Sequence, residues 1–227
     1  MTARLSGIRA VAFDAYGTLF DVASPAERLA ASLGDRWRAF AELWRAKQLQ
    51  YTWLRSLAGR HADFFQVTGD ALDFALDAVG VRDIALRERL LGLYERLDPY
   101  PDARQALARL RASGLRLAIL SNGAPNMLES ATRSAGLADL LDAILSVEEV
   151  RVFKPHPSVY RLAVDRLGVP AESLAFVSSN GWDAFSAQAY GLRVAWCNRA
   201  GQPRERIPAA PEAEIRSLAE LPDLLGA

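Results

Sequence analysis

Short apolar runs alternate with helical patterns along most of the chain, and this alternation constrains the fold more than any other feature. The apolar runs span residues 8–13, 116–120, 143–146, 174–177 and 193–196. The helical patterns that separate the later runs span residues 102–112, 126–135, 157–167 and 182–189. Strands that alternate with helices build a parallel sheet with helices on both faces. The sequence therefore predicts an α/β fold with a Rossmann-like parallel sheet core.

One long segment, from about residue 24 to residue 98, interrupts the alternation because its pattern is helical throughout. Large apolar side chains share one helical face in its first half: Trp37, Phe40, Trp44, Tyr51 and Leu54. Pro99 and Pro101 then mark the return to the alternating pattern. We therefore expect residues 1–22 and 98–227 to form the catalytic core, and residues 23–97 to form an inserted helical cap domain.

Composition argues against several classes of partner. Lys plus Arg and Asp plus Glu each number 27, so no net positive charge favours nucleic acid or a membrane surface. No run approaches the 18 apolar residues of a membrane span, and the first residues lack the pattern of a signal peptide. Cys197 is the only cysteine, which fits a reducing compartment. We expect a cytoplasmic protein.

Polar side chains follow four of the predicted strands, where parallel sheets bind their ligands. Asp14 ends the first strand, residues 121–123 follow the second, Lys154 comes after the third, and residues 178–183 follow the fourth. Each has a structural explanation by itself, since an aspartate after a strand is usually a turn or capping residue. A lone lysine is most often solvated. Their joint occurrence at strand ends predicts one functional site.

Four segments, in this order, resemble the four motifs of the haloacid-dehalogenase superfamily. Asp14–Val22 resembles the first motif, Ser121-Asn122-Gly123 the second, Lys154-Pro155 the third, and Ser178–Asp183 the fourth. Trp44–Arg55 also resembles the cap segment of the L-2-haloacid dehalogenases. The resemblance covers essentially the whole chain. It implies that superfamily's fold, a hydrolase acting on carbon–halide bonds, and a homodimer.

Two departures from the superfamily majority favour a dehalogenase over a phosphatase. Most members carry a second aspartate, two residues after the first, which protonates the leaving oxygen. Tyr16 stands there in this chain, and a phenol is a poor acid at neutral pH. Ser179-Asn180 replaces much of the acidity that holds magnesium in most members. Halide leaves as a stable anion without a proton, so we expect no metal and no cofactor.

The resemblance implies that Asp14 attacks carbon 2 of a short (S)-2-haloalkanoic acid, which becomes an (R)-2-hydroxy acid with inversion. Arg45 would receive the halide, Lys154 would balance the charge of Asp14, and Asn180 with Asp183 would organise or activate water. The implied catalytic residues are Asp14, Thr18, Arg45, Lys154, Tyr160, Ser178, Asn180 and Asp183. The implied substrate-binding residues are Ala15, Tyr16, Leu49, Phe64, Ser121, Asn122 and Trp182.

Two alternatives remain open at this stage. The first is a phosphohydrolase of the same fold, acting on a small phosphate ester and dependent on magnesium. The second is a non-catalytic binding protein. A dehalogenase of the α/β-hydrolase type is disfavoured because the chain has no Gly-x-Ser-x-Gly elbow and only two histidines. We interpret His156 as a turn residue and Cys197 as a buried, unreactive one.

Overall fold

The computed structural model describes residues 4–94 and 97–227, and its core is a six-stranded sheet in the order β3-β2-β1-β4-β5-β6. All neighbouring strands pair in parallel. The strands are β1 (Ala10–Phe13), β2 (Arg116–Ser121), β3 (Ala143–Ser146), β4 (Leu174–Ser178), β5 (Arg193–Cys197) and β6 (Ala213–Ile215). From β1 the chain adds β2 and β3 on one side of the sheet and β4 to β6 on the other. This change of direction places the expected ligand crevice at the carboxyl end of β1.

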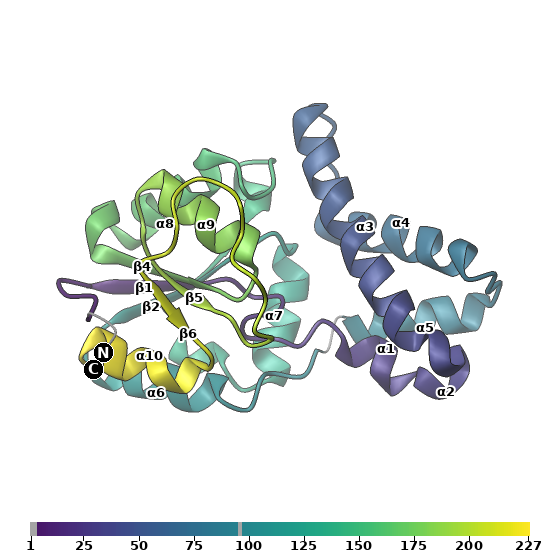
Figure 1. Ribbon diagram of the computed structural model, residues 1–227, viewed down its shortest axis with the longest axis horizontal. Helices are drawn as coiled ribbons and strands as arrows, with labels where there is room; N and C mark the ends of the chain where they lie inside the picture. Colours follow the sequence, from purple (N-terminus) through teal and green to yellow (C-terminus); the bar gives the residue numbers. More distant parts are fainter. Residues whose placement is uncertain (1–3, 95–96) are drawn as a thin grey trace.

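Helices cover both faces of the sheet, as the alternating pattern predicted (Figure 1). α6 (Ala103–Ala112) and α10 (Leu221–Leu225) lie on one face, and α8 (Pro157–Leu167) and α9 (Gly181–Tyr190) lie on the other. α7 (Pro125–Ser134) packs beside β3. The α/β prediction is therefore confirmed, although β6 and α10 were not foreseen because each is very short.

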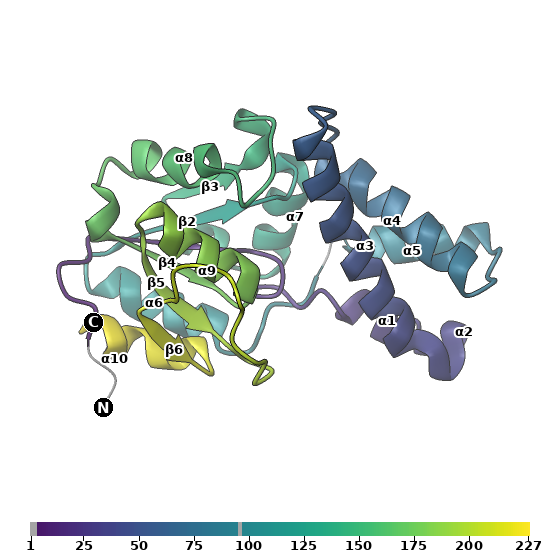
Figure 2. The same cartoon turned by 45° about the horizontal axis from the view of Figure 1, so that its top comes forward.

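Five of the α-helices between β1 and β2 lie together on one side of the core, beyond the end of β1 (Figures 1 and 2). They are α1 (Ser24–Arg28), α2 (Ala30–Leu33), α3 (Trp37–Leu57), α4 (Phe64–Ala78) and α5 (Ile84–Tyr94), and we call residues 24–94 the helical segment. The expected core range 1–22 and cap range 23–97 include residues 1–3 and 95–96, which lie outside the described residues. No helix in the described ranges is long and apolar enough to cross a membrane.

The buried face of α3 differs from the predicted one at its end. Residues Phe40, Trp44, Gln48 and Thr52 are buried at a four-residue spacing, which defines one face of the helix. Leu54 lies off this face and is 53% exposed, so its predicted place in the apolar stripe was wrong. The apolar pattern of the sequence did not identify this buried face, because Gln48 and Thr52, two of its four positions, are polar.

Candidate active site

The carboxylate of Asp14 lies at the carboxyl end of β1 and is only 5% exposed. Its Oδ1 accepts a hydrogen bond from Nζ of Lys154 at 3.0 Å. Its Oδ2 accepts from three groups: Asn180 Nδ2 at 2.6 Å, Ser178 Oγ at 3.2 Å and Thr18 Oγ1 at 3.4 Å. The carboxylate is therefore fixed in orientation, and Oδ1 is the oxygen with the fewer donors.

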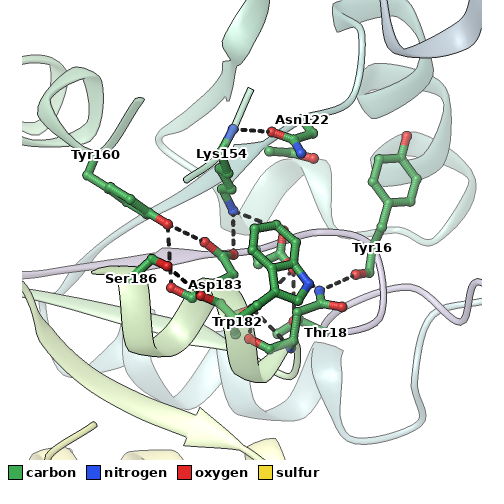
Figure 3. Close-up of polar contacts among 12 residues, drawn as sticks. Tyr16, Thr18, Asn122, Lys154, Tyr160, Trp182, Asp183 and Ser186 are labelled. Carbon is green, nitrogen blue, oxygen red and sulfur yellow. Dashed lines mark hydrogen bonds and ion pairs between the residues drawn. The ribbon is translucent and has the colours of Figure 1, made fainter. Parts of the chain in front are cut away.

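Lys154 lies between two buried carboxylates, although it is only 1% exposed itself. Its Nζ donates to Asp14 Oδ1 at 3.0 Å and to Asp183 Oδ2 at 2.8 Å, and Tyr160 donates its hydroxyl to Asp183 Oδ1 at 2.7 Å (Figure 3). Burial acts to lower the pKa of Lys154, but the charges of Asp14 and Asp183 outweigh it and raise that pKa. The ammonium group is therefore charged at neutral pH.

Asp183 and Tyr160 continue the hydrogen-bond network that begins at Asp14 and Lys154. Burial raises the pKa of Asp183 to about 6, because desolvation outweighs the opposing charge of Lys154. Burial and the neighbouring Asp183 carboxylate raise the pKa of Tyr160 well above its ordinary value. At neutral pH Tyr160 is thus a neutral donor, and both oxygens of Asp183 are engaged, one by Tyr160 and one by Lys154.

Asn122, which follows β2, fixes the position of the loop that carries Lys154. Asn122 accepts the main-chain N–H of Lys154 on its Oδ1 at 2.9 Å (Figure 3). Ser121, one residue earlier, accepts the N–H of Gly123 on its hydroxyl at 3.0 Å and shapes the turn. The loop after β3 is thereby fixed against the end of β2, which brings the lysine over the end of β1.

The turn after β1 is fixed against the end of β4. Asn180 Nδ2 donates to the carbonyl oxygen of Tyr16 at 3.0 Å, and the N–H of Ser179 donates to Thr18 Oγ1 at 2.8 Å. Gly17 has φ +91°, a conformation that side chains disfavour, and an added Cβ would also contact the amide of Asn180 at 3.6 Å. Gly17 therefore allows the tight turn that brings Asn180 to Asp14.

Arg45 reaches the site from α3. Its Nη1 donates to Gln48 Oε1 at 2.7 Å, whereas its Nη2 has only long contacts, 3.5 Å to Tyr16 O and 3.4 Å to Asn180 Oδ1. Gln48 is buried and also accepts from the Tyr94 hydroxyl at 3.1 Å. Gln48 and Tyr94 were not predicted from the sequence. The spacing of three residues between Arg45 and Gln48 could have indicated that the two side chains are neighbours on α3.

A small cavity borders Asp14, and nine residues line it, all of them among the fifteen that the sequence singled out: Asp14, Tyr16, Arg45, Leu49, Phe64, Asn122, Lys154, Asn180 and Trp182. The other six do not line it: Ala15, Thr18, Ser121, Tyr160, Ser178 and Asp183. The cavity measures only about 10 Å³, enough for roughly one water molecule. A small organic acid enters only if part of the wall moves.

The residues around Asp14 do not fit magnesium. Magnesium requires near-octahedral oxygen ligation with carboxylates, but the ammonium of Lys154 occupies the place between Asp14 and Asp183. Asp14 Oδ2 already accepts from three donors. Across residues 4–94 and 97–227, no group of three or more His, Cys, Asp or Glu side chains is arranged to hold a metal ion.

Two residues interpreted as structural have structural roles. His156 is exposed and caps α8, because its Nδ1 accepts the N–H of Ser158 at 3.2 Å. Cys197 is fully buried, and burial raises the pKa of its thiol. A buried thiol with a raised pKa is a poor nucleophile. Both interpretations are confirmed, and neither residue lines the cavity at Asp14.

Comparison with known proteins places the chain in a well-populated family. Residues 8–191 match the model of the haloacid dehalogenase-like hydrolases. The (S)-2-haloacid dehalogenase 1 of Pseudomonas sp. (strain CBS-3) is 45% identical over 219 residues, which is 96% of each chain. A solved dehalogenase in an intermediate complex superposes with a TM-score of 0.96, at 41% identity over 98% of this chain and 99% of that one.

A further solved relative carries an organic acid. The L-2-haloacid dehalogenase from Xanthobacter autotrophicus with chloropropionic acid covalently bound superposes with a TM-score of 0.90. It is 41% identical to this chain, and the match covers 97% of this chain and 99% of that one. The match thus spans the helical segment as well as the sheet core.

Proposed function

Because the chain belongs to the haloacid dehalogenase-like hydrolases, we propose that it is a hydrolase of carbon–halide bonds that converts short (S)-2-haloalkanoic acids to (R)-2-hydroxy acids through an ester of Asp14. One observation carries the proposal. The carboxylate of Asp14 borders a small cavity that Arg45 and Lys154 also line, so two positive charges lie beside the nucleophile. Tyr16 occupies the position at which a phosphatase of this superfamily has its acid.

In the first step, Oδ1 of Asp14 attacks carbon 2 from the side opposite the halogen. The new carbon–oxygen bond forms as the carbon–halogen bond breaks, and the halide leaves with the bonding electron pair. Attack from the rear inverts carbon 2. Three donors hold Oδ2 and one ammonium holds Oδ1, so the carboxylate needs little reorganisation before it reacts.

Arg45 lies where it can receive the departing halide. Its Nη1 is held by Gln48, and the contacts of its Nη2 with Tyr16 O and Asn180 Oδ1 are long, so this group can turn toward a developing anion. Tyr16, Leu49, Phe64 and Trp182 supply the apolar part of the cavity wall. Asn122 Nδ2 is the neutral donor that we propose for the substrate carboxylate, since Asn122 Oδ1 is used by Lys154.

In the second step, water adds to Cγ of the Asp14 ester, and the bond from Cγ to the substrate oxygen breaks. The hydroxy acid takes one proton of the water, the other passes to solvent, and the carboxylate is regenerated. Asn180 reaches Asp14 Oδ2 at 2.6 Å and can orient this water. We assign Asp183 to positioning Lys154, because its oxygens are engaged and it does not line the cavity.

Halide release is the direct test of this function. We expect the purified protein to release halide from chloroacetate, bromoacetate and (S)-2-chloropropionate, with (R)-lactate as the product of the last. The (R)-enantiomer of 2-chloropropionate should be a poor substrate, because rear attack fixes the arrangement around carbon 2. Ion chromatography measures the halide, and chiral chromatography identifies the lactate. Absence of halide release from every acid would refute the proposal.

Metal independence separates this function from the phosphohydrolase alternative. A carboxylate that attacks a phosphoryl group needs magnesium to neutralise charge on that group, whereas carbon 2 of a haloacid carries no such charge. We expect full halide release after exhaustive EDTA treatment and no stimulation by added magnesium. Loss of activity with EDTA and its return with magnesium would instead favour hydrolysis of a small phosphate ester.

Three expectations from the family resemblance stay predictions. The helical segment should act as the cap over the site, which its contribution of Arg45, Leu49 and Phe64 to the cavity wall supports. The protein should form a homodimer, which light scattering of the purified protein would check. It should reside in the cytoplasm, which cell fractionation would check, and its one cysteine is buried and unpaired.

A further inference from the structure

A groove of about 710 Å³ adjoins the small cavity at Asp14 and shares Lys154 and Trp182 with it. We propose that this groove is the route by which the haloacid reaches Asp14, and that Trp53 and Trp182 form a gate between groove and cavity. The inference rests on the proposed function. The groove is of the size that binds small organic molecules, and its lining is predominantly apolar.

Lys154 and Trp182 line both spaces, and Trp53 packs on Trp182 from the side of the groove. Trp182 begins α9 in the core and lines both spaces, whereas Trp53 comes from α3 and lines only the groove. The two rings meet edge to face, with centroids 5.4 Å apart and an interplanar angle of 80°. Separation of α3 from α9 at this point would therefore join the two spaces.

The walls of the cavity at Tyr16 and at Arg45 are closely packed. Tyr16 is stacked on Phe64 with ring centroids 5.4 Å apart and packs against Tyr94 at 5.7 Å. A Cβ added at Gly123 would lie 2.7 Å from the Tyr16 ring, so this wall is close-packed. Behind Arg45 the neighbouring void measures only about 10 Å³. Trp182 lines both the cavity and the groove of about 710 Å³, whereas a second groove of about 440 Å³ beside Ser179 and Gly181 shares no lining residue with the cavity.

The gate has an unusual electrostatic property. The Nε1 atoms of Trp53 and Trp182 are buried, and neither has a hydrogen-bond partner within the described residues. Buried indole N–H groups usually find an acceptor, and leaving one unsatisfied costs free energy. Hence no hydrogen bond of either indole holds the rings in place, and separation of the two rings would expose both N–H groups to a passing carboxylate. The donors suit the anionic substrate.

A few contacts near the gate hold the end of α3 on the core. Ser56, three residues after Trp53, accepts the main-chain N–H of Phe153 on its hydroxyl at 3.1 Å. His61, just beyond α3, lies 2.9 Å from a carboxylate oxygen of Glu148. Arg55 also pairs with Asp70 of α4 at 2.6 Å, so we expect the end of α3 to move away from the core together with α4, which separates Trp53 from Trp182.

The gate makes Trp53 a determinant of substrate size. Trp53→Ala should remove the outer ring of the gate, so that an alkyl tail can extend from the cavity into the apolar groove. We expect the ratio of kcat/KM for 2-bromohexanoate to that for 2-bromopropionate to rise by about tenfold or more, since even one methylene in an apolar pocket changes this ratio by that order. Trp53→Phe, which keeps a ring, should leave the ratio closer to that of the wild type.

Ile84→Ala is the control, because it also removes a large apolar side chain, but Ile84 is 76% exposed on α5 and lines neither the groove nor the cavity. Its ratio should equal that of the wild type. Bromide release by the wild type but an unchanged ratio in a folded Trp53→Ala protein would overturn the gate alone. No bromide release by the wild type would overturn the proposed function instead. Circular dichroism reports folding, and Trp53→Leu replaces the alanine variant if that one does not fold.

Discussion

Asp14→Asn should abolish halide release, with a loss of roughly four orders of magnitude or more, as for the removal of other covalent nucleophiles. The amide preserves the size of the side chain but has no anionic oxygen to attack carbon 2. It also removes one of the two carboxylates that pair with Lys154. Steady-state halide release measures the loss, and the intact mass verifies that the asparagine has not been hydrolysed back to aspartate.

A single turnover in heavy-oxygen water tests the covalent step itself. Because water attacks Cγ of the ester, the hydroxyl oxygen of the first hydroxy acid should come from unlabelled Asp14. The heavy oxygen should appear in the peptide that contains Asp14. Label in the hydroxy acid after one turnover would show that water attacks carbon 2 directly and would contradict the ester.

Asp139→Asn is the control for Asp14→Asn. Asp139 lies on the surface, where a 3.8 Å contact with Arg104 is its ion pair within the described residues. Exposed pairs of this kind contribute little to stability. The same chemical change there should leave halide release unchanged, so a loss specific to Asp14 cannot come from the general effect of removing one negative charge.

Arg45→Ala should lower kcat/KM by about 100-fold to 1000-fold, the usual effect of losing one preorganised transition-state donor. The physical reason is that Arg45 is held by Gln48 on one side and keeps Nη2 beside the cavity on the other. Arg45→Lys should restore only part of the rate, because an ammonium cannot donate to Gln48 and to halide in the planar geometry of a guanidinium.

Arg38→Ala is the control for Arg45→Ala, because Arg38 belongs to the same helix but is exposed, with its guanidinium over the ring of Trp37. It should retain wild-type kcat/KM with 2-chloropropionate. An alanine variant at Arg45 that performs as well as this control would show that the arginine has no role in halide departure.

Local patterns in the sequence were sufficient for the sheet core and for the position of Asp14. Strands of a parallel sheet end at one edge, so polar residues that follow successive strands must come together whatever the details of packing. This geometric rule is why Asp14, Asn122, Lys154 and Asn180 were all predicted and all line the cavity. Roles beyond this placement came from the family resemblance.

Tertiary structure alone decided how the helical segment meets the core. A helical pattern reports which face is buried, but it does not fix the rotation of α3 or its distance from a residue 135 positions away, such as Asn180 from Arg45. Polar residues on the buried face, such as Gln48, blur that pattern further. The contact of Trp53 with Trp182, and hence the groove behind it, depends on this docking. The hydrophobic periodicity of a sequence describes one helix or strand at a time. The cavity at Asp14 exists only where the helical segment packs against the sheet core.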